Sequence, residues 1–146
     1  NLTIEGLNSC SATLVPKGSL IFSKRAPIGS VVISSVELCT NQGCLSCIPY
    51  TSNLTKYYYY VMSICTEQYN LLGSGTTFKE ISASNFMNFS LPLPTISEQQ
   101  AIVSYLDQKC THIDKLISIK QKKIEKLQQY KKSVIYEYVT GKKEVK

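Results

Sequence analysis

The 146-residue sequence lacks the patterns on which most enzymes depend. It has a single histidine, His112, and no Walker loop, dinucleotide fingerprint or pair of carboxylates at catalytic spacing. It also has no apolar run long enough to span a membrane and no signal-like N-terminus. These absences predict a non-catalytic protein without a cofactor, which we expect in the cytoplasm and not at a membrane.

Cysteine is the exception to this scarcity of reactive residues. Cys39, Cys44 and Cys47 match the plant-type iron–sulfur spacing, with Cys65 available as a fourth ligand. The alternative is that these are small apolar residues within strands and helices. Apolar residues interleave with the cysteines, as they do in a buried strand, so we favour the second interpretation and expect no metal.

The net charge of +6 is unevenly distributed. Residues 1–94 contain five Lys or Arg and four Asp or Glu, whereas residues 95–146 contain eleven Lys and six acids. A basic balance is compatible with nucleic-acid binding. A solvated helix face rich in lysine is an equally good interpretation of the C-terminal lysines.

The segment from Ser97 to Val139 predicts one long helix. Ser97 is expected to cap its start, with Gln100 as the reciprocal partner three residues on. No Gly or Pro interrupts the segment before Gly141, which supplies a left-handed stop. At the helical rise, a segment of this length makes a rod of about 65 Å.

This helix carries apolar residues in a heptad register, with lysine at two of the positions. Alone, it leaves a stripe of Ile and Leu in water, so it needs a helical partner. No other segment is long enough to supply one, and the simplest partner is a second copy of the chain. The residues expected at this dimer interface are Val103, Leu106, Cys110, Ile113, Ile117, Lys120, Ile124, Leu127, Lys131, Val134 and Tyr138.

The first ninety-odd residues predict a small mixed unit. Turn residues separate apolar or β-branched runs, which gives strands at 19–22, 30–34 and 44–48. Helical spacing then runs from a cap at Asn53 to Gly73. Alternating apolar residues predict a further strand at 87–91, and a stiff Leu-Pro-Leu-Pro hinge leads into the long helix.

An ordered series of short motifs runs through this pattern. The first are Lys17-Gly18-Ser19-Leu20-Ile21, Arg25-Ala26-Pro27-Ile28-Gly29, Thr40-Asn41-Gln42-Gly43 and Gly73-Ser74-Gly75-Thr76-Thr77. The later ones are Leu91-Pro92-Leu93-Pro94, Glu98-Gln99 and Val139-Thr140-Gly141-Lys142. In this order and spacing, the chain resembles the DNA specificity subunits of type I restriction–modification systems.

The resemblance implies an α+β fold with two parts. Residues 1–94 would form part of a small, mostly-β target recognition domain, and residues 95–146 the long helix that follows it. In that family, two such units pair their helices as an antiparallel coiled coil, which sets the distance between the halves of a split site in double-stranded DNA. Methylation subunits dock around this frame, and a restriction subunit joins them.

Only one unit is present here, so the resemblance implies a half-subunit that dimerises. The family's recognition domain normally has several tens of residues ahead of a position like Asn1. The resemblance therefore also implies that this chain contains only the C-terminal portion of that domain.

Basic and Gly-rich loops supply the candidate DNA contacts. Lys24 and Arg25 could bind phosphate or guanine, or be an ordinary exposed pair. Asn41 could present its amide to bases or hold its own turn, and the glycine loop could bind phosphates. The candidates are Ser23, Lys24, Arg25, Asn41, Gln42, Gly73, Ser74, Gly75, Thr76, Thr77 and Lys79.

Two other functions stay open at this point. The chain could be a coiled-coil assembly protein, or a truncated specificity fragment, that binds DNA without sequence preference. It could also be an iron–sulfur redox module, which depends entirely on the four cysteines named above.

Overall fold

The computed structural model describes residues 3–49, 52–75 and 79–145, apart from the side chains of residues 52–54. Its contacts divide the chain into two compact units, Asn1–Val103, called the head below, and Ser104–Lys146, called the rod. The expected division at residue 94 stays a prediction about function. Among the described helices, none combines the length and apolar character that a bilayer span requires.

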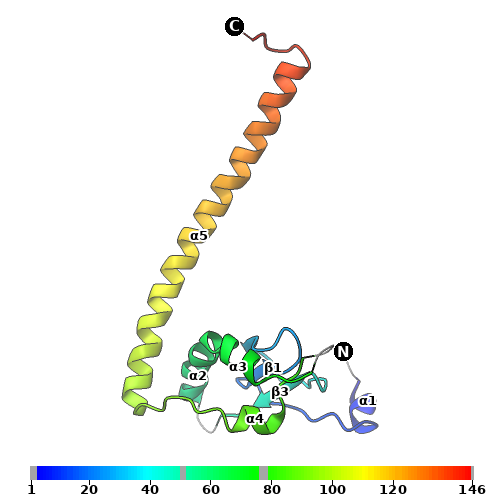
Figure 1. The fold of residues 1–146 in the computed structure, drawn as a ribbon, viewed down its shortest axis with the longest axis vertical. Coiled ribbons are helices and arrows are strands. Elements are labelled where there is room, and N and C mark those ends of the chain that lie inside the picture. The colour runs from blue at the N-terminus through cyan, green and yellow to red at the C-terminus, as the bar shows by residue number, and fades with distance from the viewer. Residues whose placement is uncertain (1–2, 50–51, 76–78, 146) are drawn as a thin grey trace. The chain divides into compact units, whose positions relative to one another are not determined.

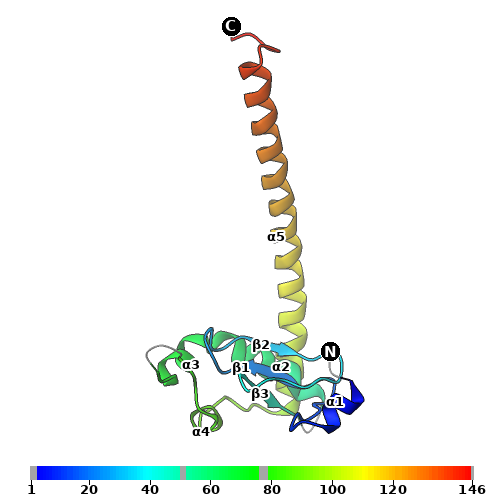
Figure 2. The ribbon, with the colours of Figure 1, turned by 90° about the vertical axis from the view of Figure 1, so that its right-hand side faces the viewer.

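The head contains a three-stranded antiparallel sheet in the order β2-β1-β3 (Figures 1 and 2). The strands are β1 (Leu20–Ser23), β2 (Val31–Ile33) and β3 (Cys44–Cys47), which confirms the three strands expected first along the chain. Central β1 places Phe22 opposite Val31 of β2 and Leu45 of β3. The β1–β2 connection, residues 24–30, contains Pro27 and Gly29, and the longer β2–β3 connection, residues 34–43, ends in a turn at Gly43.

The head's core forms on one face of β1, where Leu20 and Phe22 are buried and their neighbours are only half-buried. Aromatic rings close around Phe22: its centroid lies 4.8 Å from that of Tyr69 and 4.6 Å from that of Phe86. The buried cluster consists of Leu20, Phe22, Ile28, Met62, Tyr69 and Ile81. The buried face of β1 thus packs against residues from two helical segments and two loops in one core.

The expected helix between Asn53 and Gly73 is two helices, α2 (Ser52–Ile64) and α3 (Thr66–Leu72), so the prediction of one helix is wrong. The break falls at Cys65. It places Thr66 against Gly29, where an added Cβ would lie 3.0 Å from Cγ2 of Thr66, and it lets the Asn70 amide donate to the Ile28 carbonyl at 3.3 Å. Tertiary packing of the neighbouring loop therefore overrides a continuous helical pattern.

The strand expected at 87–91 is also absent. Residues 83–87 form the short helix α4 (Ala83–Met87), because the Ser82 hydroxyl accepts a bond from the Asn85 N–H at 3.0 Å and caps its start. Phe89 and Leu91 do pack against the core, but from an extended segment that has no sheet partner among the described residues. The short helix α1 (Ile4–Asn8) precedes the sheet.

The long helix α5 (Ile96–Val139) confirms the main prediction from the sequence (Figure 1). Its expected cap is wrong: Thr95, not Ser97, begins it. The Thr95 backbone and hydroxyl both donate to Oε2 of Glu98, at 2.9 and 2.7 Å, and the Glu98 N–H points back to the hydroxyl. This is a capping box shifted by two residues, and these bonds lower the pKa of Glu98.

The other end of α5 is as expected. Gly141 adopts φ +72°, the left-handed conformation that ends a helix, and the Thr140 N–H closes the last turn on the Tyr136 carbonyl. Between the ends, every side chain from residue 111 to residue 133 is exposed. Six of the eleven predicted seam residues lie in this stretch, with Ile117 60% and Leu127 57% exposed.

Candidate nucleic-acid interface

Two loops that are far apart in the sequence lie side by side at the end of β1. The Ile81 N–H donates to the Lys24 carbonyl at 2.9 Å, and the Ala26 N–H donates to the Lys79 carbonyl at 3.1 Å. Ser74 and Glu80 also exchange backbone bonds in both directions at 2.9 Å. These pairings hold the basic loop that begins at Ser23 against the glycine loop that begins at Gly73.

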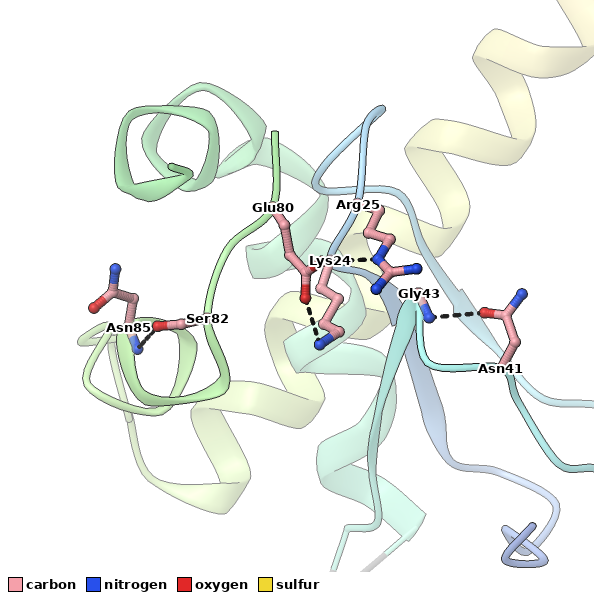
Figure 3. Close-up of polar contacts among 7 residues, drawn as sticks. All are labelled: Lys24, Arg25, Asn41, Gly43, Glu80, Ser82 and Asn85. Carbon is pink, nitrogen blue, oxygen red and sulfur yellow. Dashed lines mark hydrogen bonds and ion pairs between the residues drawn. The ribbon is translucent and has the colours of Figure 1, made fainter. Parts of the chain in front are cut away.

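Glu80 lies at the centre of this arrangement (Figure 3). One carboxylate oxygen is 2.6 Å from Nζ of Lys24 and the other is 2.8 Å from Nε of Arg25. These two hydrogen-bonded cations hold the pKa of Glu80 below its usual range. The carboxylate therefore stays ionised at neutral pH and bridges the two basic residues.

The two cations differ in how much of each side chain reaches solvent. Lys24 is 19% exposed, whereas Arg25 is 49% exposed. Because Glu80 bonds Arg25 through Nε, the two terminal nitrogens of the guanidinium extend beyond the carboxylate (Figure 3). The interpretation of this pair as ordinary exposed residues does not fit Lys24, which is largely covered.

The turn that carries Asn41 lies against the same loop. The Gly43 N–H donates to Oδ1 of Asn41 at 2.9 Å (Figure 3). The Gly43 carbonyl accepts from the Lys24 N–H at 2.9 Å. Asn41 thus holds its own turn, as one of the two interpretations expected. Gln42, at the tip of this turn, is exposed.

Ser23 shapes the basic loop from within. Its hydroxyl lies 2.9 Å from the Arg25 carbonyl and 3.0 Å from the Pro27 carbonyl, so it closes the loop on itself. With its hydroxyl engaged this way, Ser23 supports the conformation of the loop that presents Arg25.

The glycine loop has conformational reasons for its glycines. A Cβ on Gly73 would lie 2.7 Å from Cδ1 of Ile28, and Gly75 has φ +105°. Gly73 also ends α3, with its N–H bonded to the Tyr69 carbonyl. Ser74 is exposed, as is Lys79, while Thr76 and Thr77 lie outside the described residues. Phosphate binding is therefore not needed to explain either glycine.

Sequence reasoning missed Glu80, the residue that joins the two loops. One signal was present: Glu80 is the only acid between Glu67 and Glu98. That isolation does not name a partner, because the partners follow only from the pairing of two segments 55 residues apart.

The cysteines do not gather. Within the described ranges, no group of three or more His, Cys, Asp or Glu residues could hold a metal ion. Cys44 and Cys47 stand three residues apart on β3, which places them on opposite faces of the sheet. Burial raises the pKa of the Cys47 thiol, opposite to what a metal-binding thiolate needs.

Comparison with known proteins shows which family this chain resembles. The profile of the type I restriction modification DNA specificity domain matches residues 1–129. The type I restriction enzyme MjaIX specificity subunit of Methanocaldococcus jannaschii is 35% identical over 130 residues, which covers 88% of this chain and 29% of that protein. The putative MjaX specificity subunit of the same organism is 31% identical, over 91% of this chain and 31% of its own length.

Solved structures show the same fold. A chain from a structure described as the basis of complex assembly and conformational transition of the type I R-M system aligns with TM-score 0.75 and 25% identity, over 88% of this chain and 32% of that one. The type I restriction–modification S subunit from M. genitalium aligns with TM-score 0.55 and 23% identity, over 74% of this chain and 30% of its own. This chain spans about a third of the length of these relatives. With its three-stranded sheet, long helix and profile match over most of its length, the chain belongs to the family of type I restriction–modification DNA specificity domains.

Proposed function

We propose that this chain acts as a non-catalytic half-subunit for DNA recognition in a type I restriction–modification complex. Two copies pair through α5 in an antiparallel coiled coil, and each head reads one half of a bipartite site in double-stranded DNA. The methylation and restriction subunits of the same system are the further partners, and the cytoplasm is the expected compartment. The names of the relatives support the DNA-recognition part of this proposal.

The main support for a dimer is the exposed apolar seam of α5. Exposed Ile and Leu side chains at heptad spacing are stable in water only when a second helix covers them. The candidate interface is the seam named from the sequence, Val103 to Tyr138, in which Val103, Leu106, Cys110 and Val134 are half-buried and the others are more exposed or polar.

The two seam lysines support the antiparallel orientation that the family implies. In a parallel, in-register pair, Lys120 and Lys131 would each face the same lysine of the second copy, and like charges in a seam are destabilising. An antiparallel pair can place each lysine opposite apolar residues, where the long stem packs and the ammonium reaches the edge. A two-fold dimer of identical heads then favours inverted half-sites.

The candidate DNA contacts lie on the paired loops and the Asn41 turn. Lys24, Arg25 and Lys79 supply the positive charge, and Gln42, Ser74 and the remaining loop residues named above supply polar groups. Ser23 and Asn41 bond to their own loops, so we assign them to holding the contact residues in place.

Two measurements test the proposal. Light scattering should give the mass of a dimer, and selection from a pool of randomised DNA duplexes should enrich two inverted half-sequences around a fixed spacer. The mass of a monomer would refute the proposal that the seam is a dimer interface. A dimer that enriches no sequence would refute base reading, because only base contacts and DNA shape distinguish sites.

A second candidate function rests on the exposed seam of α5 alone. In this alternative, the chain is an assembly element that dimerises and binds other subunits, and its head does not read sequence. DNA binding that depends steeply on salt and is indifferent to sequence would favour it.

A further inference from the structure

The positive charge of the head is concentrated at the paired loops. Three of the five Lys and Arg among residues 1–94 are Lys24, Arg25 and Lys79, and the two of them that form ion pairs, Lys24 and Arg25, share one acid, Glu80. The remainder of that segment carries two cations and three acids. The paired loops therefore carry a net positive charge, which favours binding of an anion there.

The surface at this region is concave. A hollow of about 470 Å³ is lined by Arg25, Ala26, Lys79 and Glu80. Glu80 does not make the hollow negative, because its two oxygens are already paired with Lys24 and Arg25. What the hollow presents to a ligand is the outer part of the Arg25 guanidinium and the exposed Lys79 side chain.

We propose that this hollow binds a phosphate of the DNA backbone, with Arg25 and Lys79 as its two cationic contacts. A side chain that reads bases must project into a groove, whereas Arg25 is half-covered and is tied back at Nε by Glu80. A guanidinium held in a hollow can instead bond a phosphate that lies along the surface, through its two terminal nitrogens. The ligand's identity rests on the proposed function, but the contact itself is independent of sequence.

The experiment measures how the affinity of the full chain for two unrelated DNA duplexes depends on salt. Each phosphate contact releases counterions, so losing one lowers the slope of log affinity against log salt concentration by about 0.9 for each head engaged. Arg25→Gln and Lys79→Gln should each lower the slope by part of this amount, equally for both duplexes, because both side chains bind the same phosphate. The double variant, which removes the contact, should lower the slope by the full amount.

Lys17→Gln is the matched control. Lys17 is exposed in the turn before β1, at the opposite end of that strand from Lys24, and its replacement removes the same charge. The control should keep the wild-type slope. Thermal melts followed by circular dichroism verify folding, and Lys79→Gln tests the hollow without breaking the Glu80 ion pairs.

Two results would overturn the proposal: wild-type slopes for Arg25→Gln and Lys79→Gln, or an equal loss of slope in Lys17→Gln. Unequal losses on the two duplexes would also contradict it, since they indicate base contacts. If the slopes fall as expected while selection from the randomised pool enriches nothing, the phosphate contact stands and the sequence-reading function fails.

Discussion

The head and the rod use apolar residues in opposite ways. In the head, Phe22, Ile81 and Tyr69 are almost completely buried, and neighbouring rings pack at centroid distances below 5 Å. In the rod, Ile113, Ile117 and other residues of the same kind are half or more exposed. The head satisfies its apolar pattern within one chain, whereas the rod's pattern is satisfied only by a second helix.

This difference predicts that stability and association depend on separate residues. A change in the head's core should unfold the head without affecting pairing of the rods. A change in the seam should separate two copies and leave each head folded. Variants that fail to separate these effects would show that the two regions fold as one.

The largest effect is expected from Leu127→Asp in the seam. An unpaired charge buried at an interface costs about 3–5 kcal/mol, and a symmetric dimer would contain two. Light scattering should therefore give a monomer or an aggregate, with unchanged near-ultraviolet circular dichroism from the head's aromatic rings. Gln129→Asp, which puts the same charge two residues away and off the seam, should remain dimeric; equal dissociation would contradict the seam.

Phe22→Ala should act on the head alone. Removing this buried ring from its aromatic neighbours costs about 3–5 kcal/mol of unfolding free energy. Thermal or urea unfolding followed by near-ultraviolet circular dichroism should show loss of the head, while light scattering still gives a dimer. Tyr105→Ala, which removes an exposed ring on α5, is the control. If it destabilised the head as much as Phe22→Ala does, the head and the rod would not be independent in stability.

Thr95→Ala tests the start of α5. It removes the hydroxyl that bonds Glu98, and loss of a helix cap costs about 1 kcal/mol. We expect a small fall in melting temperature without loss of the dimer. The change Ser97→Ala, at the cap position expected from sequence, should have less effect, and the reverse order would contradict the observed capping box.

The smallest effect is a pH dependence confined to the head. Lys24 and Arg25 lower the pKa of Glu80 in the folded state, so its contribution to stability is present above the ordinary glutamate pKa. That contribution is lost as pH falls through the lowered value. The melting temperature of Glu80→Gln should therefore decline less than that of the wild type under acid conditions. Glu37→Gln, at an exposed carboxylate, should follow the wild type.

The sequence predicted those elements whose signals are local. The three strands lie between turn residues, and the long helix has an unbroken heptad register, so short-range patterns sufficed for both. The break at Cys65 and the helix α4 depend on contacts with a distant loop and on one serine cap. The alternating pattern at Phe89 and Leu91 predicted correctly that both side chains are partly buried, but the strand that it also predicted does not form.

The candidate site was predictable in part for a similar reason. Lys24, Arg25 and Lys79 were visible as cations next to Gly and Pro, and the structure brings all three to one place. Glu80 was not, because its role arises from pairing two loops that sequence spacing cannot bring together. The cap moved from Ser97 to Thr95 because Glu98 offers Thr95 a charged partner, which Gln100 could not offer Ser97.

The contact between Gly73 and Ile28 has a consequence for sequence variation. A library randomised at residue 73 and screened for folded protein should return glycine, and alanine where Ile28 shifts, but few larger residues, since a methyl group would already lie 2.7 Å from Cδ1 of Ile28. Gly18, by contrast, has φ +88° but open space around it, so asparagine and aspartate should also be recovered there. Two glycines that look alike in the sequence are thus under different selection, one for volume and one for backbone angle.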